Sequence, residues 1–286
     1  MTTRLAAVVL CLCFVAACKK SDPPQTEPAA KGEQKQESRS KGTSVKLTLA
    51  APKVGAKYSV KNDTLVSMTA LGAEMSSNET RAYDVEVVEV DEDAPVKANV
   101  KYTAAKTVEV EEGKPVPPTE SPLLGKSYVV SLQGEEVVAT DAKGVKVSEE
   151  ELALIRDDID FLGKPDAVRV ELAAREFKVG EAAPGLADAL TKEIADGAAE
   201  SGEESDIKFS EVKVVLSEDK GTHAVFTVTL KMDQKVEEAP MSAKLSGTVE
   251  ARKSDAEITK LELSGPLELG GGLASGKMSI ASVRTE

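Results

Sequence analysis

The feature that most constrains the fold is an alternation of apolar and polar side chains with a period of two residues. Successive side chains of a β-strand point to opposite faces of a sheet, so this pattern predicts half-buried antiparallel strands. The clearest stretches are Val45–Leu49, Tyr83–Val87, Ala224–Met232 and Met241–Ala251. Turn-forming residues at 91–95, 217–221 and 253–255 separate such stretches, which predicts hairpins and meanders.

Two segments have a helical pattern instead. Ser148 and Glu151 have the spacing of a capping box, and apolar residues then recur on one helical face as far as Leu162. A second helix is predicted to follow Pro184 and to stop at Gly197. Two helices among about ten strands predict an α+β fold that is mainly antiparallel β, with a curved sheet and the helices on one of its faces.

The chain also contains a weak internal repeat. Lys53-Val54-Gly55 recurs as Lys178-Val179-Gly180, and the segment 83–103 aligns without a gap with 209–229 at an offset of 126. The alignment would make Tyr83 equivalent to Phe209. It predicts two similar halves, 44–165 and 166–286, and the alternative is a coincidence of β-patterning.

The first residues have the form of an export signal. Arg4 precedes an apolar segment, Leu5–Ala17, which is too short for the roughly 20 residues that cross a bilayer. The segment ends Val15-Ala16-Ala17-Cys18, and this ending resembles the lipobox of bacterial lipoprotein precursors. The resemblance implies that residues 1–17 are cleaved off and that Cys18 is acylated. An ordinary signal peptide or a short hydrophobic anchor is the alternative.

The residues that follow Cys18 predict a disordered tether. Residues 19–43 are rich in proline and charge, so 18–43 would be the lipidated cysteine with its tether, and 44–286 the folded body. A tether of this length reaches at most about 85 Å. Lys19 stands where the inner-membrane retention signal of enteric bacteria has Asp, so the resemblance favours the outer membrane of the cell envelope. Cys11 and Cys13 would leave with the signal, which makes the body free of thiols.

Charge excludes one class of partner. Residues 44–286 hold 29 basic and 45 acidic side chains, a net charge of −16. Nucleic-acid binding needs a basic footprint and adsorption to anionic lipid needs a polybasic face, and we expect neither in the body. The acid excess is the pattern of a soluble, well-hydrated surface.

Two motifs imitate catalytic sequences without their context. Gly271–Lys277 matches the first seven positions of a phosphate-binding loop, but Met278 replaces the hydroxyl residue and no helix follows, so the glycines predict a flexible turn. Ser38–Lys41 has the Ser-x-x-Lys spacing of penicillin-recognising enzymes, yet it lies in the predicted tether, where nothing would fix the lysine beside the serine.

Metal and acid–base sites are also not predicted. His223 alternates with polar residues opposite Phe226, so it should face water. Asp157, Asp158 and Asp160 lack the later ligands of a calcium loop and are expected to form a solvated helix face. The sequence therefore predicts no catalytic residue, no cofactor and no metal ligand, with Cys18 as the single modification site.

A non-enzymatic function is the consequence. Valine, leucine and alanine at inward positions, with few aromatic residues, suit a smooth apolar cleft. At the level of architecture a curved sheet backed by helices resembles the half-barrel of periplasmic lipoprotein carriers, whose concave face holds acyl chains, and the body resembles other β-rich secreted lipoproteins. We therefore expect a lipid-anchored binding module for an apolar ligand. The alternative is a structural lipoprotein that binds another envelope protein.

Overall fold

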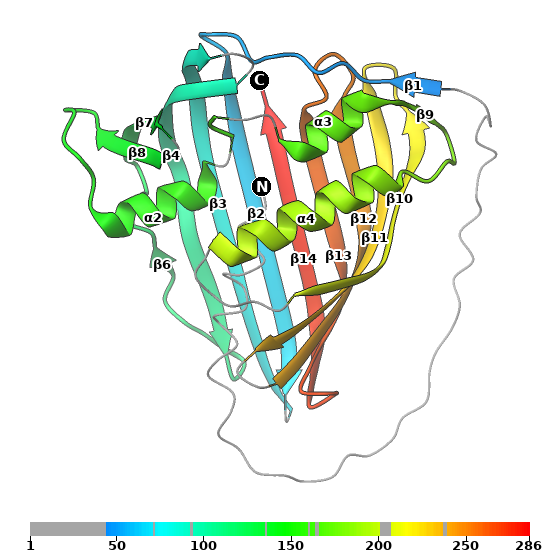
Figure 1. Cartoon of the computed structure of the whole chain (residues 1–286). Coiled ribbons are helices and arrows are strands. Elements are labelled where there is room, and N and C mark those ends of the chain that lie inside the picture. The colour runs from blue at the N-terminus through cyan, green and yellow to red at the C-terminus, as the bar shows by residue number, and fades with distance from the viewer. Residues whose placement is uncertain are drawn as a thin grey trace.

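One large, curved, open antiparallel sheet dominates the molecule (Figure 1). The computed structural model describes residues 44–70, 72–91, 94–134, 136–159, 161–163, 166–200, 207–236 and 239–286. The strands are β1 (Ser44–Lys46), β2 (Lys57–Ala70), β3 (Ala73–Asp91), β4 (Ala94–Glu111), β5 (Lys114–Pro115), β6 (Thr119–Glu120), β7 (Ser127–Gln133), β8 (Glu136–Asp141), β9 (Glu176–Lys178), β10 (Lys208–Asp219), β11 (His223–Val236), β12 (Ala239–Arg252), β13 (Ile258–Leu269) and β14 (Ala274–Thr285).

The topology is a long meander that begins and ends at the middle of the sheet. Within the described residues the sheet has twelve strands: ten follow the order β10-β11-β12-β13-β14-β2-β3-β4-β7-β8, and β5 and β6 both pair with β4. The C-terminal strand β14 therefore lies beside β2, with Ala274 opposite Ala70 and Thr285 opposite Ser59. β1 pairs with β9 in a separate two-stranded sheet. The predicted fold class, mainly antiparallel β with helices, is confirmed.

Three helices of the described chain lie on one face of the sheet (Figure 1). They are α2 (Glu149–Asp158), α3 (Ala167–Ala174) and α4 (Pro184–Glu200). The capping box at Ser148 is confirmed, because its hydroxyl accepts from the Glu151 N–H while the Glu151 carboxylate accepts from the Ser148 N–H. The predicted ends were wrong: α2 stops before Leu162, and α4 continues past Gly197, where alanines that favour helix follow the glycine.

Helix α3 was not predicted. Its N-cap is Asp166, whose carboxylate accepts hydrogen bonds from the backbone N–H groups of Val168 and Arg169. The predicted strand at Val45–Leu49 is shorter than expected. β1 ends at Lys46, and although Leu47 is fully buried, Leu49 is 39% exposed.

The repeated tripeptides make the same contact in the two parts of the chain. The N–H of Gly55 donates to the Val87 carbonyl of β3, and the N–H of Gly180 donates to the Leu216 carbonyl of β10. The gap-free alignment at an offset of 126 is nevertheless wrong in the first strand of each hairpin, β3 and β10. The two glycine hydrogen bonds make Val87 equivalent to Leu216, which is an offset of 129. The bulge between Ser210 and Lys213 disturbs the register of β10. The division into two similar halves stays a prediction.

The inner face of the sheet carries two apolar clusters. One lies beneath α3 and α4 and includes the lower part of β2 from Val66 to Ala70; the other lies beneath α2 and includes Tyr58. Between them on β2 are the buried polar side chains of Asn62 and Thr64. Within the described part of the chain, no helix is both long enough and apolar enough to cross a membrane.

Candidate functional site

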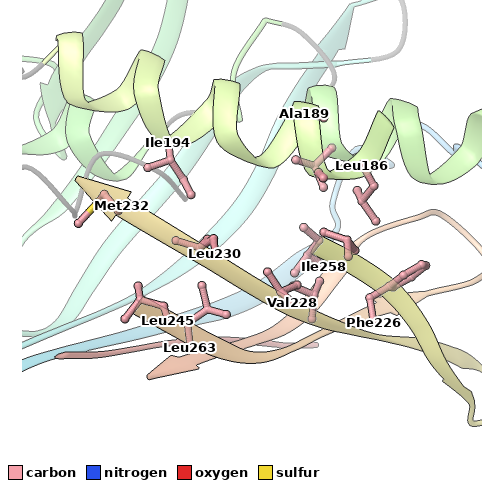
Figure 2. Packing of buried hydrophobic residues seen from close by; sticks show 14 of the residues in the cluster. Leu186, Ala189, Ile194, Phe226, Val228, Leu230, Met232, Leu245, Ile258 and Leu263 are labelled. Carbon is pink, nitrogen blue, oxygen red and sulfur yellow. The ribbon is translucent and has the colours of Figure 1, made fainter. Parts of the chain in front are cut away.

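The largest apolar surface of the described chain is the inner face of the sheet beneath α4 (Figure 2). Period-two alternation places Phe226, Val228, Leu230 and Met232 of β11 on this face, and each is at most 3% exposed. The helical period places a matching apolar stripe on α4. The described side chains of that stripe are Leu186, Ala187, Ala189, Leu190 and Ile194.

Aromatic rings lie towards both ends of this interface, because Phe209 of β10 packs against the same cluster opposite Met232. Phe177 of β9 meets Phe226 edge-to-face, with ring centroids 5.2 Å apart. Elsewhere the two sides are lined by aliphatic residues and methionine, among them Leu245 and Leu263 (Figure 2). Such a surface can hold an apolar chain by contact area, but it lacks the polar groups that would orient a reacting substrate.

Helix α2 also packs apolar side chains on the sheet, with Ile155 fully buried, but charged and polar contacts at both of its ends hold it in addition. At its start Glu151 accepts from Lys126 Nζ at 2.6 Å and from the Tyr128 hydroxyl at 3.1 Å. The hydrogen bond from Lys126 lowers the pKa of Glu151, against the effect of burial. At its end the Tyr83 hydroxyl donates to the Asp158 carbonyl at 2.9 Å. These contacts fix α2, whereas α4 faces the sheet with apolar side chains.

The expected solvated face at Asp157, Asp158 and Asp160 was wrong for Asp158. Its side chain is fully buried and lies 3.4 Å from Nη1 of Arg81, which is itself only 15% exposed. A buried carboxylate needs such a partner, because an unpaired charge would be strongly destabilising in this position. Asp157 is half-buried, and Asp160 lies outside the described residues.

A second group of charges closes the end of the sheet near α3. Glu257 lies 3.4 Å from Arg169 Nη1 and also binds Arg284, while the Arg284 guanidinium stacks 3.4 Å from the ring centroid of Tyr58. Burial raises the pKa of Tyr58 to about 12, although Arg284 opposes the shift. The residues form a compact ion-pair network, and the arginines are engaged by carboxylates of the same chain.

A groove of about 680 Å³ lies on the other face of the sheet, across β2, β3, β4 and β7. Outward side chains line it, and several satisfy one another: Lys57 pairs with Glu86 at 3.2 Å, and Ser59 donates to Asp84 at 2.6 Å. These mutual contacts occupy the groups that would otherwise bind a ligand. The groove is thus a weaker candidate than the apolar inner face.

The structure describes some of the residues that the sequence analysis singled out, and others lie outside its described range. Gly271 and Gly272 form the β13–β14 turn with positive φ angles of 67° and 99°, so the phosphate-loop match is a turn, as predicted. His223 is half-buried at the start of β11, with Nδ1 3.0 Å from the Thr222 hydroxyl. Cys18 and Ser38–Lys41 lie outside the described residues. Among those that are described, no cluster of three or more His, Cys, Asp or Glu could hold a metal ion.

Comparison with known proteins adds little. No family model and no curated protein matches the chain. Among solved structures it is similar to DynF from the dynemicin biosynthesis pathway of Micromonospora chersina, with 9% identity over 92% of each chain and a TM-score of 0.23. A likeness at that level carries nothing about fold or function, so the functional inference rests on the residues described above.

Proposed function

We propose that this chain is an exported, lipid-anchored protein of the cell envelope whose body binds an apolar ligand and catalyses no reaction. The observation that carries the proposal is the contrast between the helices. Polar contacts attach α2 to the sheet at both ends, whereas the described side chains with which α4 faces β11 and its neighbours are apolar. The ligand we propose is a lipid with at least one long acyl chain.

The physical reason is that a ligand can replace apolar contacts more easily than ion pairs. Apolar contacts are non-directional and scale with buried area, so an acyl chain can replace side chains of α4 against β11 at little cost. An acyl chain carries no charge along its length, so it cannot replace a partner of an ion pair. The start of α4 is held by the bond from the Ala183 N–H to the Val214 carbonyl at 2.8 Å. The helix can therefore shift about this end while the sheet stays in place.

The ligand experiment uses the chain from Lys19 onward, which retains every described residue and has no acyl group. Lipids extracted from the purified protein should contain about one acyl lipid per chain by mass spectrometry. Leu190→Asp puts a charge on the half-buried sheet-facing side of α4 and should reduce that content about fivefold or more. The matched control is Asp188→Ala on the exposed side of the same helix, which should retain the lipid.

Circular dichroism and a thermal melt of both variants separate loss of the ligand from loss of the fold. Absence of lipid from the unmodified chain would reject the binding module and favour the structural, protein-interaction function. Equal lipid content in both variants would reject the surface beneath α4 as the site.

The anchor is tested at the lipobox. We expect Cys18→Ala to leave an uncleaved precursor without acyl groups, because the thiol is the group that would be acylated before cleavage. Cys13→Ala, in the same segment, should be processed normally. Mass spectrometry of the mature N-terminal peptide measures both results, and normal processing with membrane retention in Cys18→Ala would contradict the anchor. Two acyl chains would be needed, since one alone gives only marginal membrane binding.

A further inference from the structure

Between the tether and β2 the chain has a composition unlike the rest. No acidic residue lies between Glu37 and Asp63. The same stretch contains six basic residues: Arg39, Lys41, Lys46, Lys53, Lys57 and Lys61. The net charge of −16 over the whole body conceals this segment. Its described part after β1, Leu47–Ala56, is here called the rim strap.

The rim strap runs along one end of the sheet from β1 to β2 (Figure 1). Its backbone is fixed at several points. The Thr48 N–H donates to the Lys253 carbonyl at 2.9 Å, Arg169 Nη2 donates to the Ala50 carbonyl at 3.1 Å, and the Gly55 N–H donates to the Val87 carbonyl at 2.8 Å. Because these bonds use backbone atoms of the strap, they leave its outward side chains available.

Apart from Thr48, the exposed side chains of the strap, and of Lys46 directly before it, are apolar or basic. Leu49 is 39% exposed and Val54 is 66% exposed, and Val170 of α3, next to the arginine that binds the strap, is 42% exposed. Lys46 and Lys53 are exposed, and neither forms an ion pair with another described residue. Exposed aliphatic residues flanked by free lysines are the combination that binds the surface of an anionic bilayer.

We propose that the rim strap is the face with which the body contacts an anionic lipid surface. This inference rests on the proposed anchor, which places Cys18 in the membrane. The described chain begins at Ser44, directly before the strap, so the tether enters the body at this end. The opposite end carries the β13–β14 turn, about 45 Å away along β2, and Leu273 at that turn is 76% exposed.

The chain contains no tryptophan, so one introduced tryptophan reports on a single position. Val54→Trp is placed in the unacylated chain from Lys19 onward and mixed with vesicles of phosphatidylethanolamine and phosphatidylglycerol at a ratio of about three to one. Its fluorescence should shift to shorter wavelength and be quenched by brominated lipid. Leu273→Trp, the matched control at the other end, should show neither change.

The lysines provide an independent measurement. Lys46→Glu combined with Lys53→Glu should weaken binding to these vesicles by about tenfold or more, and raised salt should weaken binding of the unmodified strap. Equal responses of Val54→Trp and Leu273→Trp, or no response of Val54→Trp, would overturn the inference. Since this protein has no acyl group, that result is distinguishable from failure of the anchor, which appears in the mass of the Cys18 peptide.

Discussion

Gly265→Ala should lower the free energy of unfolding by more than about 3 kcal/mol. A Cβ atom at Gly265 would lie 1.8 Å from the backbone carbonyl oxygen of Lys244 on the neighbouring strand and 2.8 Å from its carbonyl carbon. Backbone cannot turn aside as a flexible side chain can, so β12 and β13 would have to separate. Urea unfolding followed by circular dichroism measures the loss.

The position is one of three that form a diagonal line. A Cβ at Gly247 would lie 1.8 Å from the Glu262 carbonyl oxygen, and one at Gly276 would lie 1.9 Å from that of Ser67. Gly247 pairs with Leu263, two residues from Gly265, and Gly265 pairs with Met278, two residues from Gly276. The glycines thus step across β12, β13 and β14, and at each of them the backbone of a neighbouring strand lies where a side chain would begin.

Two substitutions, one on β13 and one in the β13–β14 turn, serve as references for this result. Ser264→Ala changes the next residue without placing an atom against backbone, so it should alter stability by less than about 0.5 kcal/mol. Gly271→Ala has open space but a φ of 67°, and it should cost about 1 kcal/mol. If Gly265→Ala were no worse than Gly271→Ala, the close approach of β12 and β13 would not depend on the missing side chain.

Local sequence patterns predicted the parts of the fold that depend on local interactions. Alternation identified long strands because one face of the sheet is buried and the other is hydrated. The capping box at Ser148 was found because both of its partners lie within four residues. Helix α3 was missed because it is only eight residues long and because Gly163 and Pro165 precede it in the sequence, a combination typical of the end of a helix.

Contacts between distant residues could not be predicted in the same way. Asp158 looked like a hydrated helix residue because Arg81 lies 77 positions earlier in the chain. Nothing in its neighbours indicates that β3 passes behind this turn of α2. The gap-free alignment of the two segments failed in β10 for a related reason, since the non-glycine residue Glu211 has a φ of 53° at an irregularity that no spacing of apolar residues indicates.

In the candidate site, too, local patterns could be predicted from the sequence and contacts between distant residues could not. The apolar stripe of α4 and the inward residues of β11 were each visible as periodic patterns, and the prediction of an apolar cleft came from them. That α2 has charged contacts in addition to its apolar packing depends on partners such as Lys126 and Glu151, 25 residues apart. Only the assembled sheet brings these partners together.

Phe226→Ala is the second substitution with a large expected effect, a loss of about 3 to 5 kcal/mol in the free energy of unfolding. The ring is fully buried, and the neighbouring strands place Leu216 and Val249 directly opposite it. Removing it leaves a cavity in a layer that cannot collapse, because hydrogen bonds on both sides hold β11. Val100→Ala, also inward and 1% exposed, removes fewer atoms and should cost about 2 kcal/mol.

The ring of Phe226 also joins the sheet to β9 through its edge-to-face contact with Phe177, and β9 pairs with β1, where the described chain begins. A double-mutant cycle of Phe226→Ala and Phe177→Ala should therefore give a coupling of about 0.5 to 1.5 kcal/mol. His223→Ala, three residues away on the same strand and half-exposed, should stay within about 0.5 kcal/mol of the unmodified protein. A strongly destabilised His223→Ala variant, or a Phe226→Ala variant as stable as Val100→Ala, would show that the stability of β11 does not come from its apolar inner face.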